Sequence, residues 1–171
     1  VFVPVYLNGK GPFTYELDSG GHFILTEATA AALGLKPQGS FTSTGAGMEV
    51  HQSGYVPIEE LRIGEAVVAH QTAKVLPLSH NDRPGSTPRA GLLGLEFFER
   101  FIVSIDHRNK NLTLHLISTR GMEHEGRPLP IAFDEDAPLT EGAFNGLPGS
   151  VMLDIGNASP TIVEHSWAAN S

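Results

Sequence analysis

The segment Leu17-Asp18-Ser19-Gly20-Gly21 decides how this sequence is interpreted, because an acidic turn ends an alternating apolar pattern there. Residues 1–7 alternate as a strand, Asn8-Gly9 is a strong hairpin signal, and residues 13–17 alternate again. The pattern predicts a β-hairpin whose second strand carries Asp18 into a tight turn. Gly20 and Gly21 allow a close turn and leave room for a ligand beside the carboxylate, and the Ser19 hydroxyl can donate to backbone or carboxylate.

The same pattern occurs again near the end of the sequence. Asn145-Gly146 precedes Leu153-Asp154-Ile155-Gly156, and a single-residue gap aligns this copy with the first. A β-rich stretch follows each Asp, at residues 23–25 and 161–163. An internal repeat defines architecture, so we expect a pseudo-twofold relation between residues 6–25 and 143–163.

The remaining patterns predict a mainly β chain with little helix. Thr26 is a suitable N-cap for a helix over residues 27–33 that Gly34 ends. Residues 39–54 are rich in Gly, Ser and Thr, which is typical of a mobile hairpin. Further strands are expected at about 55–63, 66–78, 102–106 and 112–117, with a polar loop at 79–90 and a short amphipathic helix at about 96–101.

Composition excludes several classes of protein. The 171 residues are 40% hydrophobic, enough for a core, and their number suggests one domain or one domain with part of another. The absence of cysteine excludes disulfides, a thiolate nucleophile and a Cys-ligated zinc site. A net charge of -8 argues against nucleic acid and anionic membranes as partners, and no apolar run reaches the ~18 residues that span a bilayer. The sequence begins inside a strand pattern without Met, so we expect a piece of a longer protein.

Two Asp loops that face each other have a defined chemistry. Neighbouring carboxylates cannot both ionise at low cost, so they share a proton. One carboxylate then acts as a base on a water molecule, and the other acts as an acid toward a scissile carbonyl.

The segment at 17–21 resembles the hydrophobic–Asp–Thr/Ser–Gly–small signature of retropepsin-like aspartic proteases, the family for which proton sharing is best known. Leu92-Leu93-Gly94 stands where these lobes have their second signature, and we expect it to be buried beneath the Asp loop. The resemblance covers residues 1–117 and resumes at 153–159, and it is similar to bacterial aspartyl proteases with two lobes in tandem. It implies a retropepsin/pepsin-like acid protease barrel lobe over 1–117, a linker over 118–127, and the start of a second pseudo-symmetric lobe over 128–171.

The resemblance also implies functional residues. Asp18 and Asp154 are implied as the catalytic pair, with Ser19, Gly20 and Gly156 supporting their loops. Residues 43–49 are implied as a flap over the substrate, with contacts from Gly45, Ala46, Gly47 and Met48. The family hydrolyses peptide bonds in extended peptide or protein substrates with no cofactor and no metal, and its resemblance favours an exported or periplasmic location.

Two departures from the family pattern leave alternatives open. Ile155 replaces the Thr or Ser expected after the second Asp, and the second repeat lacks its own flap and Leu-Leu-Gly element. The partner of Asp18 is therefore either Asp154 or Asp18 of a second subunit in a homodimer. The runner-up function is a non-catalytic peptide-binding or assembly module of the same fold, and the third is a purely structural β-domain. His22 directly follows the Asp loop and is a candidate to line the pocket.

Overall fold

The structure is a computed structural model that describes residues 1–44, 50–78, 88–118, 127–134, 136–157, 161–163 and 168. It is mainly β, as predicted, with two short helices. The strands are β1 (Phe2–Leu7), β2 (Lys10–Leu17), β3 (Ile24–Thr26), β4 (Gln38–Thr44), β5 (Val50–Ile63), β6 (Ala66–Leu76), β7 (Gly91–Leu93), β8 (Phe101–Asp106), β9 (Asn111–Leu116), β10 (Ala132–Asp134), β11 (Ala137–Phe144) and β12 (Leu147–Met152). The helices are α1 (Glu27–Leu33) and α2 (Leu95–Phe98).

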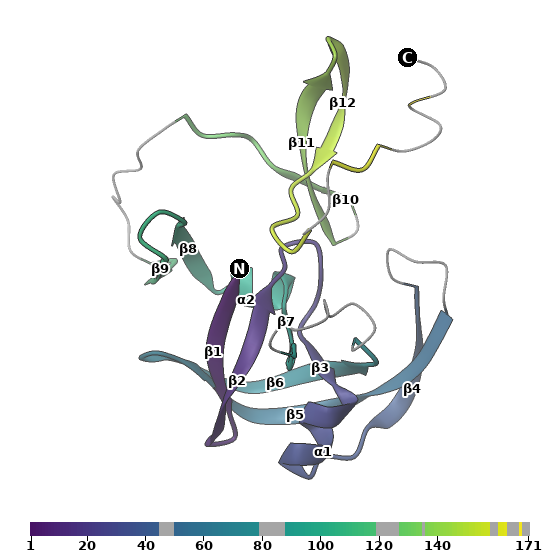
Figure 1. Cartoon of the computed structure of the whole chain (residues 1–171), viewed down its shortest axis with the longest axis vertical. Coiled ribbons are helices and arrows are strands. Elements are labelled where there is room, and N and C mark those ends of the chain that lie inside the picture. The colour runs from purple at the N-terminus through teal and green to yellow at the C-terminus, as the bar shows by residue number, and fades with distance from the viewer. Residues whose placement is uncertain are drawn as a thin grey trace.

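Six strands close into a barrel in the order β1-β2-β7-β3-β6-β5, because β5 pairs back onto β1. The β2–β7 and β3–β6 pairings are parallel and the others are antiparallel, so the barrel is mixed. β4 extends the sheet beyond β5, and α1 lies at the end of the barrel remote from β10–β12 (Figure 1). The predicted barrel lobe is confirmed.

Alternation along the strands fills the barrel interior. Val5, Leu7, Tyr15, Leu17 and Leu25 come from the first three strands and are fully buried. They pack with side chains from β5, β6 and β7, namely Val56, Ile58, Val75 and Leu93. The pattern seen in the sequence thus places every second side chain of the first hairpin in the core.

Both Asn-Gly pairs form the tight turns that the sequence predicts. Asn8 and Gly9 have φ values of 50° and 74° between β1 and β2, and Asn145 and Gly146 have 51° and 83° between β11 and β12. Consecutive left-handed residues match the twist of antiparallel strands, and Asn and Gly adopt that conformation at low cost. The hairpins of the two repeats are therefore alike.

Three sequence predictions need correction. Residues 161–163 do not form a strand, because no strand of the described chain pairs with them, whereas β3 is paired on both sides. α2 spans Leu95–Phe98 instead of about 96–101, since Phe101 already pairs with Leu116 in the β8–β9 hairpin. β5 begins at Val50, earlier than expected, because its first residues pair with β4. Helix α1 is confirmed with its Thr26 and Gly34 caps.

β10, β11 and β12 form a separate three-stranded sheet, here called the small sheet, which stands over one end of the barrel (Figure 1). Most of its side chains are exposed, including large apolar ones such as Phe133, Phe144 and Val151. Most of the predicted linker at 118–127 lies outside the described residues, so the domain boundaries remain a prediction. Among the described residues, no helix has the length and apolar character required to cross a membrane.

Candidate active site

The first Asp loop is held by the barrel. Asp18 directly follows buried Leu17, and its backbone N–H donates to the Leu93 carbonyl over 3.0 Å. The Gly20 N–H donates to Asp18 Oδ1 over 3.1 Å, so the loop orients its own carboxylate. Gly94 lies so close beneath that a Cβ on it would fall 2.0 Å from the Gly21 carbonyl oxygen. The Leu-Leu-Gly element therefore supports the loop from below, as the sequence predicts.

The second Asp loop repeats this local geometry. The Gly156 N–H donates to Asp154 Oδ1 over 2.8 Å, and the Asn157 N–H lies 3.2 Å from the same oxygen. β12 leads into the loop, and the Leu153 N–H donates to the Pro138 carbonyl over 2.9 Å. In each loop the carboxylate thus accepts the N–H of the glycine two residues on.

The two Asp loops lie against each other. A Cβ on Gly20 would lie 3.2 Å from Asp154 Cγ, and one on Gly156 would lie 2.7 Å from Asp18 Cγ. Each glycine therefore contacts the carboxylate of the opposite loop, as a pseudo-twofold arrangement requires. The structure thus brings Asp18 and Asp154 of one chain together, and it leaves no space for a side chain at Gly156.

Ser19 connects the two loops. Its hydroxyl donates to the Leu153 carbonyl over 2.6 Å and accepts from the Ile155 N–H over 3.1 Å. Ile155 has no hydroxyl to return these bonds, and its side chain is 37% exposed. Of the two residues that follow the Asp residues, only Ser19 of the first loop therefore contributes a hydroxyl group to the contact between the loops.

The environment of Asp18 favours its neutral form. Burial raises the pKa of Asp18 to about 6, helped by the charge of Asp154 and by a hydrogen bond to the Asp154 carboxyl group. The Gly20 N–H opposes this change, and the charge of Glu16 adds to it. At mildly acidic pH the pair can therefore hold one proton between two carboxylates.

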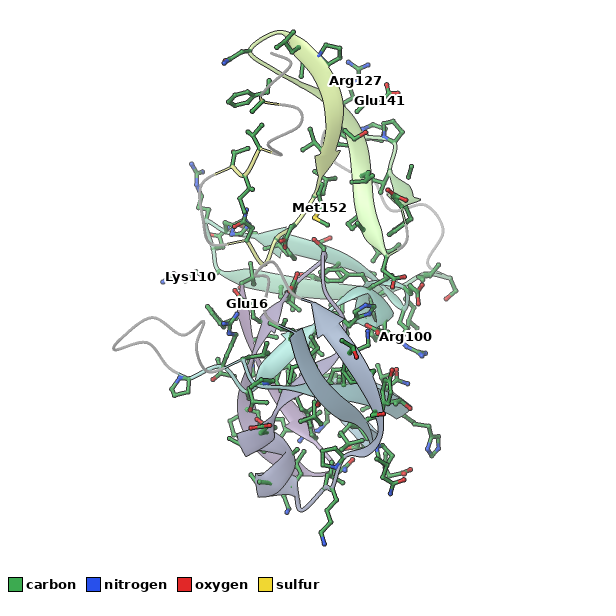
Figure 2. All side chains as sticks on the ribbon, turned by 90° about the vertical axis from the view of Figure 1, so that its right-hand side faces the viewer. Glu16, Arg100, Lys110, Arg127, Glu141 and Met152 are labelled. Atoms are coloured by element: carbon green, nitrogen blue, oxygen red, sulfur yellow. The ribbon has the colours of Figure 1, made fainter. Side chains whose placement is uncertain are left out.

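Two charged groups beside the loop were missed by the sequence reasoning. Glu16 is only 6% exposed, and Arg89 Nη1 lies 2.5 Å from its Oε2. Alternation along β2 does place Glu16 on the same face as Asp18, but nothing in the sequence indicates Arg89 as its partner. In Figure 2 Glu16 lies at the end of the barrel that faces the small sheet, while Met152 lies at the end of the small sheet nearest the barrel.

Other predicted site residues have different outcomes. His22 follows the Asp loop, and its Nδ1 lies 3.1 Å from Glu96 Oε1. The flap residues Gly45, Ala46, Gly47 and Met48 lie outside the described residues, although β4 and β5 on either side of them pair as a hairpin. Among the described side chains, no group of three or more His, Asp or Glu residues is arranged to hold a metal ion.

Comparisons with known proteins bear on the family of this chain. The aspartyl protease family model matches residues 3–97, a range that includes Asp18 and ends before Asp154. A solved structure of a retropepsin-like aspartic protease from Rickettsia conorii is similar, with 21% sequence identity and a TM-score of 0.46. That similarity covers 66% of this chain and 80% of the other. Proteins of curated function gave no significant match. Because the family model matches more than half of its residues, this chain belongs to the aspartyl protease family.

Proposed function

We propose that this protein is an aspartic endopeptidase that hydrolyses peptide bonds with Asp18 and Asp154 as its catalytic pair. The observation that carries the proposal is the reciprocal contact between the two loops, in which each glycine lies against the opposite carboxylate. The raised pKa of Asp18, caused first by burial and then by Asp154, supports a pair that holds one proton below about pH 6.

The proposed reaction starts with one proton on the pair of carboxyl groups. Asp18 holds the shared proton, and Asp154 accepts a proton from a water molecule between them. The water oxygen bonds to the carbonyl carbon of the substrate, while Asp18 gives its proton to the carbonyl oxygen. When the C–N bond breaks, the amine nitrogen takes the proton from Asp154, and a hydroxyl proton of the intermediate returns to Asp18. Both carboxyl groups thus return to their starting protonation states, and the reaction consumes one water molecule.

The substrate class proposed is an extended peptide or unfolded protein segment. The β4–β5 hairpin supports this choice, because the strand ends that flank the residues predicted as a flap point toward the end of the barrel where the small sheet stands (Figure 1). A homodimer that pairs two copies of Asp18 remains the alternative arrangement. The position of Asp154 against Gly20 of the same chain favours the single-chain pair.

Cleavage of a broad peptide library, followed by mass spectrometry at pH 4.5 and pH 7.5, tests the proposal. We expect turnover at pH 4.5 and little at pH 7.5, and none in either Asp18→Asn or Asp154→Asn. Asp106→Asn is the control, since Asp106 is the exposed last residue of β8 and accepts the Asn109 N–H. An inactive Asp18→Asn with a fully active Asp154→Asn would indicate the homodimer, and activity would then fall on dilution. Turnover that survives both single variants would refute the mechanism.

A second candidate function is a non-catalytic peptide-binding module of the same fold. Ile155 favours it, because the second loop has no hydroxyl with which to brace the first. Peptides that bind the wild-type chain without being cleaved at any pH between 3 and 8 would favour this module over the enzyme.

A further inference from the structure

His22 lies between the barrel and the small sheet and contacts an acidic group on each side. Its Nδ1 is 3.1 Å from Glu96 Oε1 of α2, and its Nε2 is 3.5 Å from Asp136 Oδ2, just before β11. The His22 side chain is 31% exposed and Glu96 is 38% exposed, while Asp136 is 62% exposed. The imidazole therefore bridges two parts of the protein that carry the two Asp loops.

The barrel side of this bridge is firmly anchored. Glu96 Oε2 accepts the Phe23 N–H over 2.8 Å, so one carboxylate binds both the side chain of His22 and the backbone after it. Leu95, the neighbour of Glu96, donates its N–H to the Gly21 carbonyl over 2.9 Å. Burial acts to raise the pKa of Glu96, but the hydrogen bonds from His22 and from backbone N–H groups outweigh it and lower the pKa. Glu96 is thus an ionised acceptor at neutral pH.

The other side of the bridge leads to Asp154. Asp136 stands two residues before Pro138, whose carbonyl accepts the Leu153 N–H over 2.9 Å. Leu153 directly precedes Asp154, and its carbonyl accepts the Ser19 hydroxyl. The segment that carries Asp136 is therefore connected to the second Asp loop by one backbone hydrogen bond.

The two contacts constrain the protonation of His22. A neutral imidazole has one N–H donor and one acceptor nitrogen, whereas a carboxylate only accepts. Both contacts form together only when both ring nitrogens carry protons. The ion pairs of His22 within the described residues are with Glu96 and Asp136, and the Asp18–Asp154 pair on the adjacent loops adds further negative charge nearby.

We propose that His22 is a positioning residue that ties the Asp154 loop to the barrel, by bridging Glu96 and Asp136 in its doubly protonated form. The bridge compensates for the hydroxyl missing at Ile155, because it adds a second connection beside that of Ser19. The bridge holds the small sheet over the first loop. Without the bridge, the second loop is held by Ser19 and backbone contacts alone. The role in catalysis rests on the proposed function, but the bridge itself does not.

The test measures the separation of the two parts directly. The chain has no cysteine, so spin labels can be attached at Glu65→Cys in the barrel turn and at Glu141→Cys on β11, both exposed positions. We expect a narrow distribution of label distances at pH 5 in the wild-type chain and a broader one in His22→Gln. Asp136→Asn should broaden the distribution at pH 5, and Asp136→Glu should restore it. Asp134→Asn, an equal charge change two residues away on β10, is the matched control and should have no effect.

A second readout is catalytic. In the peptidase assay Asp136→Asn should lower kcat roughly two- to fivefold with little change in KM, the range expected for a partly exposed ion pair. Identical distance distributions for wild type, Asp136→Asn and His22→Gln at pH 5 would overturn the proposal. Because the distances need no substrate, that outcome is separate from failure of the peptidase proposal.

Discussion

Replacing Asp18 by Asn should abolish cleavage and yet stabilise the protein near neutral pH. Asn is nearly isosteric with Asp and still accepts the Gly20 N–H through its amide oxygen, so the loop geometry should survive. It cannot give up or take the shared proton, and we expect turnover to fall by at least 10²–10⁴, the usual contribution of a general acid or base.

The stability change follows from the raised pKa. The pKa of Asp18 is about 6 in the folded protein against an ordinary value of 3.8, so between these pH values the folded state binds more protons than the unfolded state. Wild-type stability therefore decreases as pH rises through this window, and the variant lacks that decrease. About two pKa units at ~1.4 kcal/mol each set an upper limit of ~3 kcal/mol. Solvent screening of the half-buried carboxylate reduces this to on the order of 1 kcal/mol.

Urea unfolding of wild type and Asp18→Asn at pH 4 and pH 7.5 measures the effect. The two proteins should be similar at pH 4, and the variant should be more stable by about 1 kcal/mol at pH 7.5, or roughly 3 °C in Tm. Asp106→Asn should instead be less stable than wild type at pH 7.5, because hydrogen bonds from Asn109 lower the pKa of Asp106 and so stabilise the folded state when Asp106 is ionised. A variant that is clearly less stable than wild type at pH 7.5 would show that Asp18 is structural and that its pKa is not raised.

Six further substitutions test the surrounding contacts. Ser19→Ala removes both hydrogen bonds to the second loop and should lower kcat about tenfold, while Ile155→Thr should raise turnover or leave it unchanged in the same assay. Gly156→Ala should be more harmful to turnover than Gly20→Ala, because the added Cβ would lie 2.7 Å from the opposite carboxylate carbon instead of 3.2 Å; equal activity of the two would contradict the reciprocal contact. Arg89→Gln leaves Glu16 as a buried charge and should cost about 3 kcal/mol of unfolding free energy in urea, part of which Glu16→Gln should restore in the double variant.

Local patterns were sufficient for much of the barrel. The Asn-Gly turns, the caps of α1 and the alternation before Asp18 are short-range signals, because turn dihedrals and capping hydrogen bonds involve residues a few positions apart. The repeat likewise indicated two similar Asp loops, and both have the same pattern of N–H donors to the carboxylate. Predictions failed where pairing decided the outcome: residues 161–163 have strand-forming side chains but no strand beside them among the residues that the structure describes, and α2 stops where β8 begins to pair.

The amino-acid sequence by itself determined that Asp18 and Asp154 each end a hairpin in a Gly-containing turn, since alternation and turn residues act locally. Only the tertiary structure decided that the two carboxylates meet within one chain, because 136 residues separate Ser19 from Ile155 and no local rule specifies their contact. It also decided that Arg89 neutralises Glu16 and that His22 lies between Glu96 and Asp136. Such partners come together through closure of the barrel and placement of the small sheet, which depend on the packing of the chain as a whole.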